Sequence, residues 1–312
     1  MNPARFDVVT VTLNPAIDRT VTISHFTPGA VNRVEHTRNT PGGKGVNVAS
    51  ALADHGHRVA ATGFLGRANC ELFDALFAKK QIVDRFVRID GEIRVGIKIV
   101  DPANHTTTDI NFPGTAPASA DIATLREQIA ALDAPWFVLG GSLPPGVAPS
   151  FYRDLVTSLK AAGKKVVVDT SGEPLRSAVE ATPTILKPNL HELETLLGER
   201  LADENAVLRA ARSLVAWGIE LVVVSMGKDG ACFVTAEREV IARPPHVEIH
   251  GSTVGAGDAM VAGIVSAQLR SLPLDDCARL STAFSLNALT RSESNHNPRE
   301  AIAEAAKKVS LV

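Results

Sequence analysis

The sequence predicts an α/β fold, in which a doubly wound, mostly parallel sheet carries a small β-sheet lid. Short apolar runs rich in Val and Ile alternate with longer amphipathic runs, which is typical of alternating strands and helices. The short runs are apolar on both faces, as buried parallel strands are. One region instead alternates polar and apolar residues with period two, which predicts the second, smaller sheet.

Length and composition set the broad class. The chain has 312 residues, 45% of them hydrophobic and 21% charged, so we expect one globular domain spanning residues 1–312. The net charge of −2 and the 4% aromatic content give no reason to expect a nucleic-acid partner. No run approaches the 18 apolar residues of a membrane span, and the first residues do not resemble a signal peptide. The three cysteines, Cys70, Cys232 and Cys277, are far apart, which argues against disulfides or zinc and favours the cytoplasm.

Six apolar runs predict the parallel strands. They cover residues 6–13, 58–66, 136–142, 164–170, 184–189 and 220–227. Between them, residues 45–56, 149–163 and 205–218 have apolar residues at helical spacing and close on Gly, as helices do. Because ligands bind at the carboxyl ends of strands in such sheets, we expect the chemistry at the polar strand ends.

The lid is predicted from residues 17–40 and 90–112. Within the run 92–100, one face carries Ile93, Val95, Ile97 and Ile99 and the other carries Arg94, Gly96 and Lys98. Residues 19–26 alternate similarly, so we expect antiparallel strands with one apolar and one polar face. The apolar face needs a cover, which a second copy of the lid in a dimer would supply. The basic face meets an anionic substrate or is an ordinary solvated surface; the pattern alone leaves both open.

The strongest functional signal is the run STVGAGDAMVAG at residues 252–263. The small residues Gly255, Ala256 and Gly257 precede Asp258, and a helical apolar pattern begins at Ala259. Unpaired amides at a helix N-terminus attract anions, and small residues let a phosphate approach them. Asp258 at this position could accept the proton of an attacking hydroxyl. The alternative is that Asp258 is only the helix N-cap.

Two other kinds of nucleotide site do not fit the sequence. The P-loop pattern requires Gly-Lys-Ser/Thr after a spaced glycine, and neither Gly43-Lys44 nor Gly227-Lys228 has that context. The dinucleotide pattern Gly-x-Gly-x-x-Gly finds Met260 in place of its third glycine. Phosphate binding is therefore expected to be of another kind.

A second signal is the run PGGKGVNVASALADHG at residues 41–56. Gly42, Gly43 and Gly45 surround Lys44, whose charge suits a phosphate, while Asn47 can hydrogen-bond sugar hydroxyls. A flexible strand–helix loop is the alternative. Just beyond the first strand, Asn14 and Asp18 suit the hydroxyls of a polyol, although such a string is more often a turn.

Two further runs suggest a nucleotide and its metal. Asn189 and Glu192 lie three residues apart at a strand–helix junction, where they could hold Mg²⁺ through water. The alternative is an N-cap followed by a capping-box acid. The run VSMGKDGA at residues 224–231 is either a loop that contacts the nucleotide or a hairpin turn marked by glycine.

Each run is ambiguous alone, but their order is informative. NPAID, GGKGVNVA, GSLPPG, VVVDTSGE, LKPNLHELE, VVVSMGKDGA and STVGAGDAMVAG together resemble the PfkB family of carbohydrate kinases over essentially the whole chain. The resemblance implies a ribokinase-like fold, ATP and Mg²⁺ as cofactors, and a homodimer formed through the lid. It also implies that Asp258 is the catalytic base and that Gly255, Ala256 and Gly257 form the anion hole.

The resemblance assigns the remaining site residues as follows. It implies that the sugar is held by Asn14, Asp18, Gly42, Gly43, Lys44 and Asn47; the nucleotide by Lys187, Asn189, Ser225, Gly227, Gly230 and Asn287; and Mg²⁺, through water, by Asn189 and Glu192. Arg33, Lys44 and Arg94 are the cations expected near a sugar phosphate. Related kinases of 6-phosphorylated hexoses often carry a further Arg where this chain has Asp109, which favours fructose 1-phosphate, phosphorylated on its 6-hydroxyl. Tagatose 6-phosphate and fructose 6-phosphate are the alternative substrates, and a non-catalytic sugar-phosphate sensor is the alternative function.

Overall fold

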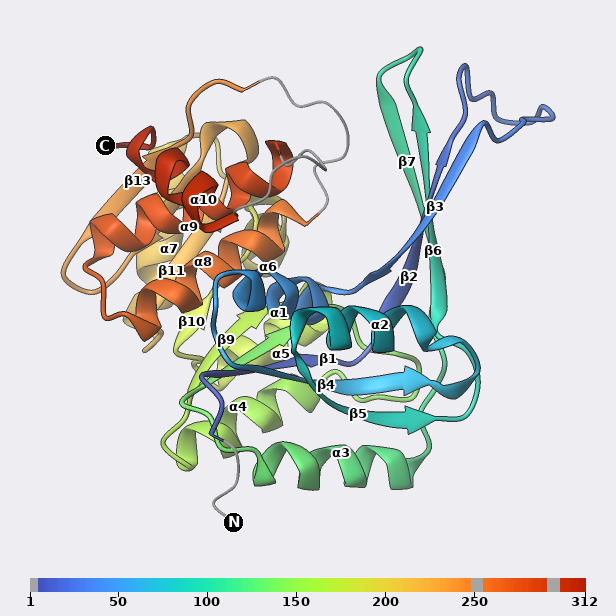
Figure 1. The fold of residues 1–312 in the computed structure, drawn as a ribbon. Coiled ribbons are helices and arrows are strands. Elements are labelled where there is room, and N and C mark those ends of the chain that lie inside the picture. The colour runs from blue at the N-terminus through green and yellow to red at the C-terminus, as the bar shows by residue number, and fades with distance from the viewer. Residues whose placement is uncertain (1–4, 248–254, 291–297) are drawn as a thin grey trace.

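The computed structural model describes residues 5–247, 255–290 and 298–312 and contains two β-sheets (Figure 1). The large sheet has ten strands and the small one has four. Helices cover both faces of the large sheet, while the small sheet projects from the body (Figure 1). The predicted α/β fold, with a mostly parallel sheet and a separate small one, is confirmed.

The ten strands of the large sheet follow the order β14-β13-β12-β11-β10-β9-β8-β1-β4-β5. Their bounds are β1 Val8–Thr12, β4 Val59–Gly66, β5 Val83–Ile89, β8 Trp136–Gly140, β9 Lys165–Asp169, β10 Ile185–Leu186, β11 Leu221–Ser225, β12 Ala231–Val234, β13 Glu239–Arg243 and β14 Ser310–Leu311. All pairings from β11 to β5 are parallel, and those from β11 to β14 are antiparallel. The six predicted strands are β1, β4, β8, β9, β10 and β11, and they lie next to one another in the sheet.

Alternate strand residues feed two hydrophobic cores. In β8, Trp136 and Val138 join the core on one face of the sheet, and Phe137 and Leu139 join the core on the other. The first core is covered by α1 (Lys44–Asp54), α2 (Glu71–Lys80), α8 (Ala256–Leu269), α9 (Leu274–Thr290) and α10 (Pro298–Lys307). The second is covered by α3 (Ser119–Ala131), α4 (Phe151–Ala161), α5 (Gly172–Glu180), α6 (Leu190–Leu197) and α7 (Glu204–Ala216). The predicted helices are confirmed as α1, α4 and α7.

The small sheet, called the lid below, contains β3 (His36–Gly42), β2 (Ala16–Thr22), β6 (Arg94–Asp101) and β7 (Thr106–Asn111) in that spatial order. Antiparallel pairing was predicted for its strands, but β2 and β6 pair in parallel, with Ala16 opposite Arg94. Each is antiparallel to its other neighbour, β3 or β7. The reason is topological: β2 follows β1 and β6 follows β5, and these two strands run in the same direction within the large sheet. Period-two patterning fixes faces, not direction.

The lid has its own apolar cluster, formed by Val21, Ile23 and Ile99. That the lid closes over a ligand, and that residues 1–312 form one domain, stay predictions. Within the described ranges, no helix combines the length and the apolar character needed to cross a bilayer.

Candidate active site

Two helices begin side by side at the carboxyl edge of the large sheet. The N-cap of α1 is Gly43, with φ of 116°, and the N-cap of α8 is Gly255, with φ of 86°. Both values lie in the left-handed region that glycine tolerates best. Because a glycine cap has no side chain, it leaves the first-turn amides exposed to a ligand. Each helix therefore begins as an anion-attracting end.

Asp258 is the third residue of α8, not its N-cap, so the capping alternative is wrong. Its side chain is buried, and its Oδ2 accepts a hydrogen bond of 2.7 Å from Nδ2 of Asn47 in the first turn of α1. The two helix starts are thus joined by one hydrogen bond. The sequence assigned Asn47 to the sugar and did not foresee this contact.

The surroundings of Asp258 make it a stronger base than an ordinary aspartate. Burial raises its pKa most, and the carboxylate of Asp169 raises it further. The Asn47 hydrogen bond and the charges of Lys44 and Lys187 act in the opposite direction, and the resulting pKa is about 6. Asp258 is therefore ionised at neutral pH and able to accept a proton.

Asp169 joins two lysines behind the cleft. Its Oδ1 lies 2.8 Å from Nζ of Lys44 and 3.4 Å from Nζ of Lys187. Burial lowers the pKa of Lys44, but Asp169 and Glu192 outweigh this, so its pKa is raised and it stays an ammonium. Asp169 was not among the predicted site residues. A signal was present, because its buried strand ends in a carboxylate at the ligand-binding edge.

One cleft of about 960 Å³ brings most of the predicted residues together. It is lined, among others, by Asn14, Asp18, Gly43, Lys44, Asn47, Arg94, Gly255, Gly257 and Asp258. The cleft lies between the lid and the carboxyl edge of the sheet. A polar ligand in it would face both helix starts.

Asn14 and Asp18, the residues predicted to hold the sugar, line the part of the cleft next to the lid. Nδ2 of Asn14 donates to the carbonyl of Pro113 at 3.0 Å and to Oγ of Ser142 at 3.2 Å, which fixes the amide. Gly42 leaves room for the carboxylate of Asp18, because a Cβ at this position would lie 2.1 Å from Oδ2 of Asp18. Burial raises the pKa of Asp18, with Lys98 and Arg94 opposing.

The predicted nucleotide residues follow the neighbouring strand ends. Lys187 comes after β10, with its Nζ 3.7 Å from where a Cβ on Gly257 would lie. The backbone of Asn189 forms an isolated parallel β-bridge with that of Ser225 at the end of β11. Gly227 and Gly230 flank the β11–β12 turn, so this run is a hairpin turn; nucleotide contact by it stays a prediction.

The capping alternative for the predicted metal residues is confirmed. Asn189 accepts from the amide of Glu192 at 2.8 Å, and Glu192 Oε2 accepts from the amide of Asn189 at 2.9 Å. The second oxygen, Oε1, lies 3.9 Å from Nζ of Lys44, toward the cleft. The described part of the chain contains no cluster of three or more His, Cys, Asp or Glu side chains suited to direct coordination. This geometry fits an ion held mainly by water and phosphates.

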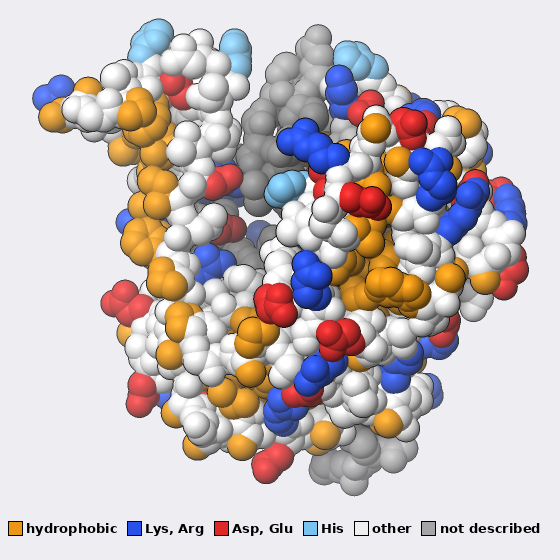
Figure 2. All heavy atoms as spheres, turned by 180° about the vertical axis from the view of Figure 1, so that it is seen from behind, with side chains coloured by type: hydrophobic (Ala, Val, Ile, Leu, Met, Phe, Trp, Pro, Cys, Tyr) orange, Lys and Arg blue, Asp and Glu red, His pale blue; other side chains and the backbone are white. Residues whose placement is uncertain are grey.

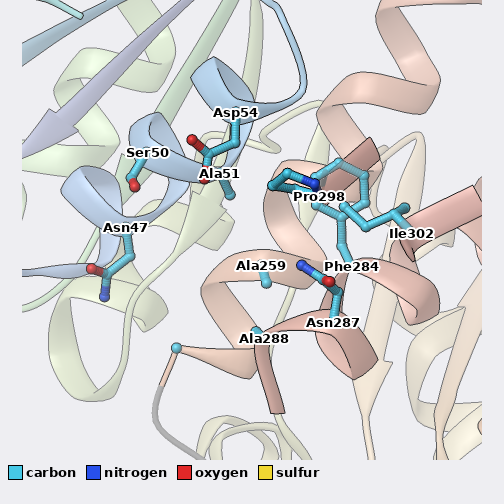
Figure 3. Close-up of a pocket in the computed structure, with 11 residues that line it drawn as sticks. Asn47, Ser50, Ala51, Asp54, Ala259, Phe284, Asn287, Ala288, Pro298 and Ile302 are labelled. Carbon is cyan, nitrogen blue, oxygen red and sulfur yellow. The ribbon is translucent and has the colours of Figure 1, made fainter. Parts of the chain in front are cut away.

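Asn287 lines a smaller pocket of about 220 Å³ between α1 and α9 (Figure 3). Asn47 and Gly255 line this pocket as well as the large cleft, so the two are adjacent. In Figure 3, the amide of Asn287 points from α9 into the pocket, opposite Ser50 and Asp54 of α1. Ala256 is fixed nearby, because Oγ of Ser285 donates to its carbonyl at 2.7 Å.

The structure separates the two predicted arginines. Arg94 lies at the base of the lid, where its guanidinium donates to the carbonyls of Asn14 and Phe112, each at 3.2 Å. Arg33 is exposed in the β2–β3 connection at the far end of the lid, away from the cleft. The structure therefore does not bring Arg33 together with the other predicted residues.

The family follows from comparison with known proteins. Residues 11–301 match the pfkB family of carbohydrate kinases. The chain belongs to the PfkB family. It is 45% identical to the 1-phosphofructokinase of Xanthomonas campestris over 96% of both chains, and 47% identical to that of Rhodobacter capsulatus over 97% of both.

Solved structures of PfkB kinases share the fold. Phosphofructokinase-2 from Escherichia coli, in complex with fructose-6-phosphate, superposes with a TM-score of 0.88 at 28% identity, covering 96% of this chain and 99% of its own. A possible 1-phosphofructokinase from Thermotoga maritima gives 0.86 at 31% identity, covering 98% of each chain. This PfkB chain is accordingly a sugar-phosphate kinase with a ribokinase-like fold.

Proposed function

We propose that the protein transfers the γ-phosphoryl group of ATP to the 6-hydroxyl of fructose 1-phosphate, giving fructose 1,6-bisphosphate. The observation that carries this proposal is the position of Asp258. It lies in the first turn of α8, where a proton acceptor and exposed amides face the same cleft. The relatives named 1-phosphofructokinase support the choice of substrate.

Asp258 acts as the general base. Its Oδ2 is held by Asn47 at 2.7 Å, which leaves Oδ1 to accept the proton of the 6-hydroxyl. The hydroxyl oxygen then attacks the γ-phosphorus as the bond to the β-phosphate oxygen breaks. The proton stays on Asp258 until the product leaves. A pKa near 6 suits both steps.

The charge on the transferring group is met by the α8 amides and by Lys187. Amides of Gly255, Ala256 and Gly257 form the start of the helix, where the helix dipole also favours an anion. The ammonium of Lys187 lies beside Gly257 and is held there by Asp169. Closure of the lid would exclude water, which otherwise competes as phosphoryl acceptor.

Mg²⁺ would be held through water by Asn189 and Glu192. The capping box fixes both side chains, and Oε1 of Glu192 remains directed toward Lys44 and the cleft. Magnesium keeps several waters in protein sites, so indirect contacts are sufficient. When bound with ATP, the ion would neutralise phosphate charge.

The order of strands supports the placement of the two substrates. Parallel strand ends from β11 to β1 present Ser225, Lys187, Asp169, Ser142 and Asn14 in turn. The predicted nucleotide residues lie at one end of this series, with Asn287 on α9 placed beside the adenine. The predicted sugar residues lie at the other end, beneath the lid. Asp258 faces the middle, where phosphoryl transfer would occur.

The lid also supports a homodimer. On its outer face Val21 and Ile99 are already buried, whereas Ile97 is half-buried and Ile110 beside it is 45% exposed. Figure 2 shows hydrophobic side chains following the lid along its length. A second copy of the same face would cover them.

The chain carries three free cysteines, which fits a reducing cytoplasm.

The proposed substrate is tested by ATP-dependent turnover of fructose 1-phosphate, fructose 6-phosphate and tagatose 6-phosphate, compared by kcat/KM. We expect fructose 1-phosphate to be preferred by about tenfold or more, equivalent to about 1.4 kcal/mol in transition-state binding. Preference for a 6-phosphate would keep the family and mechanism but overturn the substrate and the argument from Asp109. Absence of turnover with any sugar phosphate would favour a sensor instead.

A further inference from the structure

The loop that follows β8 forms one wall of the cleft. Residues 141–147, which lead from β8 toward α4, all line it. The chain leaves the strand at Gly141, whose φ of 92° lies in the left-handed region that glycine tolerates best. The position of this wall therefore depends on what fixes the backbone of Gly141.

Three hydrogen bonds meet at Gly141. Its amide donates to the carbonyl of Asp169 at 3.0 Å. Its carbonyl accepts from Oγ1 of Thr170 at 2.8 Å and from the hydroxyl of Tyr152 at 3.2 Å. The same Tyr152 hydroxyl lies 3.1 Å from the carbonyl of Gly140, the last residue of β8. The start of the loop is thus held from the end of β9 and from α4 together.

Tyr152 reaches the loop from the opposite side of the sheet. It belongs to the core that α3–α7 cover, whereas α1 and α8, which begin at the cleft, lie on the other face (Figure 1). Its side chain is 0% exposed, and burying a hydroxyl costs free energy unless the group is hydrogen-bonded. Burial raises the pKa of Tyr152 and the carboxylate of Asp169 raises it further, so the hydroxyl keeps its proton and remains a donor. The ring serves the core, while the hydroxyl serves the loop.

From Gly141 the restraint passes to Asn14 through Ser142, the next residue of the loop. Oγ of Ser142 accepts from Nδ2 of Asn14 at 3.2 Å, and the second bond of that amide, to the carbonyl of Pro113, is 3.0 Å long. A length of 3.2 Å is already at the long end of the usual range, so a small displacement of the loop would break the bond. The orientation of the Asn14 amide in the cleft therefore depends on the position of Gly141.

We propose that Tyr152 is a positioning residue for the sugar substrate: its hydroxyl fixes the loop after β8 and, through Ser142, sets the orientation of Asn14. The proposal rests on the proposed function in taking Asn14 as a residue that binds the sugar. Tyr152 is fully buried, so it acts without touching the substrate. Thr170 donates to the same carbonyl of Gly141 and supports the same position from the end of β9.

The test compares the parent with Tyr152→Phe, Thr170→Val and Thr62→Val. The last is the matched control, because the buried hydroxyl of Thr62 donates to the carbonyl of Arg85 at 2.7 Å, within β4 and β5. We measure Tm, KM for fructose 1-phosphate and for ATP, and the Kd of the sugar phosphate by calorimetry. Tyr152→Phe and Thr170→Val should each raise KM and Kd for the sugar phosphate about three- to tenfold, with KM for ATP unchanged within about twofold. Thr62→Val should lower Tm at most and leave both KM values as in the parent.

A double-mutant cycle tests the route through Ser142. In a Ser142→Ala protein the link to Asn14 is already absent, so adding Tyr152→Phe should change the Kd of the sugar phosphate little further. The full loss repeated in that background would overturn the inference. So would an unchanged sugar affinity in Tyr152→Phe, or a loss that affects ATP equally, which would make Tyr152 a residue of the core alone. If the parent phosphorylates a different hexose phosphate, the proposed function fails separately, and the same changes are expected with that sugar.

Discussion

Asp258 is a carboxylate whose protonation state depends on several elements at once. Asn47 and Lys44 reach it from α1, and Asp169 and Lys187 act from the ends of β9 and β10. Protonation would remove the proposed base. We therefore expect activity to fall as the pH drops through about 6, the pKa of Asp258, and to be retained above it. The measurement is kcat as a function of pH at saturating substrates.

Asp169→Asn separates the titration of the enzyme from that of the substrate phosphate, whose second pKa is also about 6. Because the carboxylate of Asp169 raises the pKa of Asp258, the variant should shift the acidic limb to lower pH. The titration of the substrate cannot respond to this substitution. An unshifted limb in an active, folded Asp169→Asn enzyme would assign the limb to the substrate rather than to Asp258.

At the residue scale, the sequence indicated which polar side chains lie at the site but not which residues they contact. Asn14 and Asp18 were selected because they follow the end of an apolar run, and Asp258 because three small residues precede it at the start of a helical pattern. The Asn47–Asp258 hydrogen bond joins residues 211 positions apart, and no local pattern can indicate such a contact. The position of Asp169 at the end of a buried strand was a local signal that the prediction did not use, whereas its pairing with Lys44 of α1 and Lys187 after β10 could not be seen in any local pattern.

The contact between α8 and α9 positions the start of α8. Gly263 lies where the helices approach most closely, because a Cβ on it would lie 2.5 Å from the Cα of Ser281. The clash involves backbone, so the helices must separate. We expect Gly263→Ala to cost about 1–3 kcal/mol in the free energy of unfolding, seen as a lower Tm in thermal denaturation. An unchanged Tm would mean that the two helices are not packed as closely as the structure shows.

The elements that were predicted are those with a strong local pattern. The six central strands are apolar on both faces, and each was found. β5 was missed because Asp84, Arg85 and Arg88 interrupt its apolar character at the sheet edge. The predicted antiparallel pairing of β2 with β6 was wrong, because the direction of each lid strand is set by the strand of the large sheet that it follows.

The whole molecule presents the lid as a separate surface, and its assembly is a prediction at that scale. Ile97 lies on the apolar outer face, so Ile97→Lys should convert the expected dimer into a monomer in size-exclusion chromatography with light scattering. Thr107→Lys adds the same charge to the opposite face and is the matched control. A parent protein that is monomeric, or an Ile97→Lys variant that stays dimeric, would contradict assembly through the lid.

The central claim, phosphoryl transfer to the sugar with Asp258 as base, is tested most directly by following ³¹P NMR signals of ATP and fructose 1-phosphate. The parent and Asp258→Asn are compared side by side, with ATP affinity measured for both. We expect the parent to form ADP and fructose 1,6-bisphosphate in equal amounts, and the variant to be about 10²- to 10⁴-fold slower with ATP affinity retained. ADP formation without the bisphosphate, or comparable kcat in the two proteins, would contradict the account.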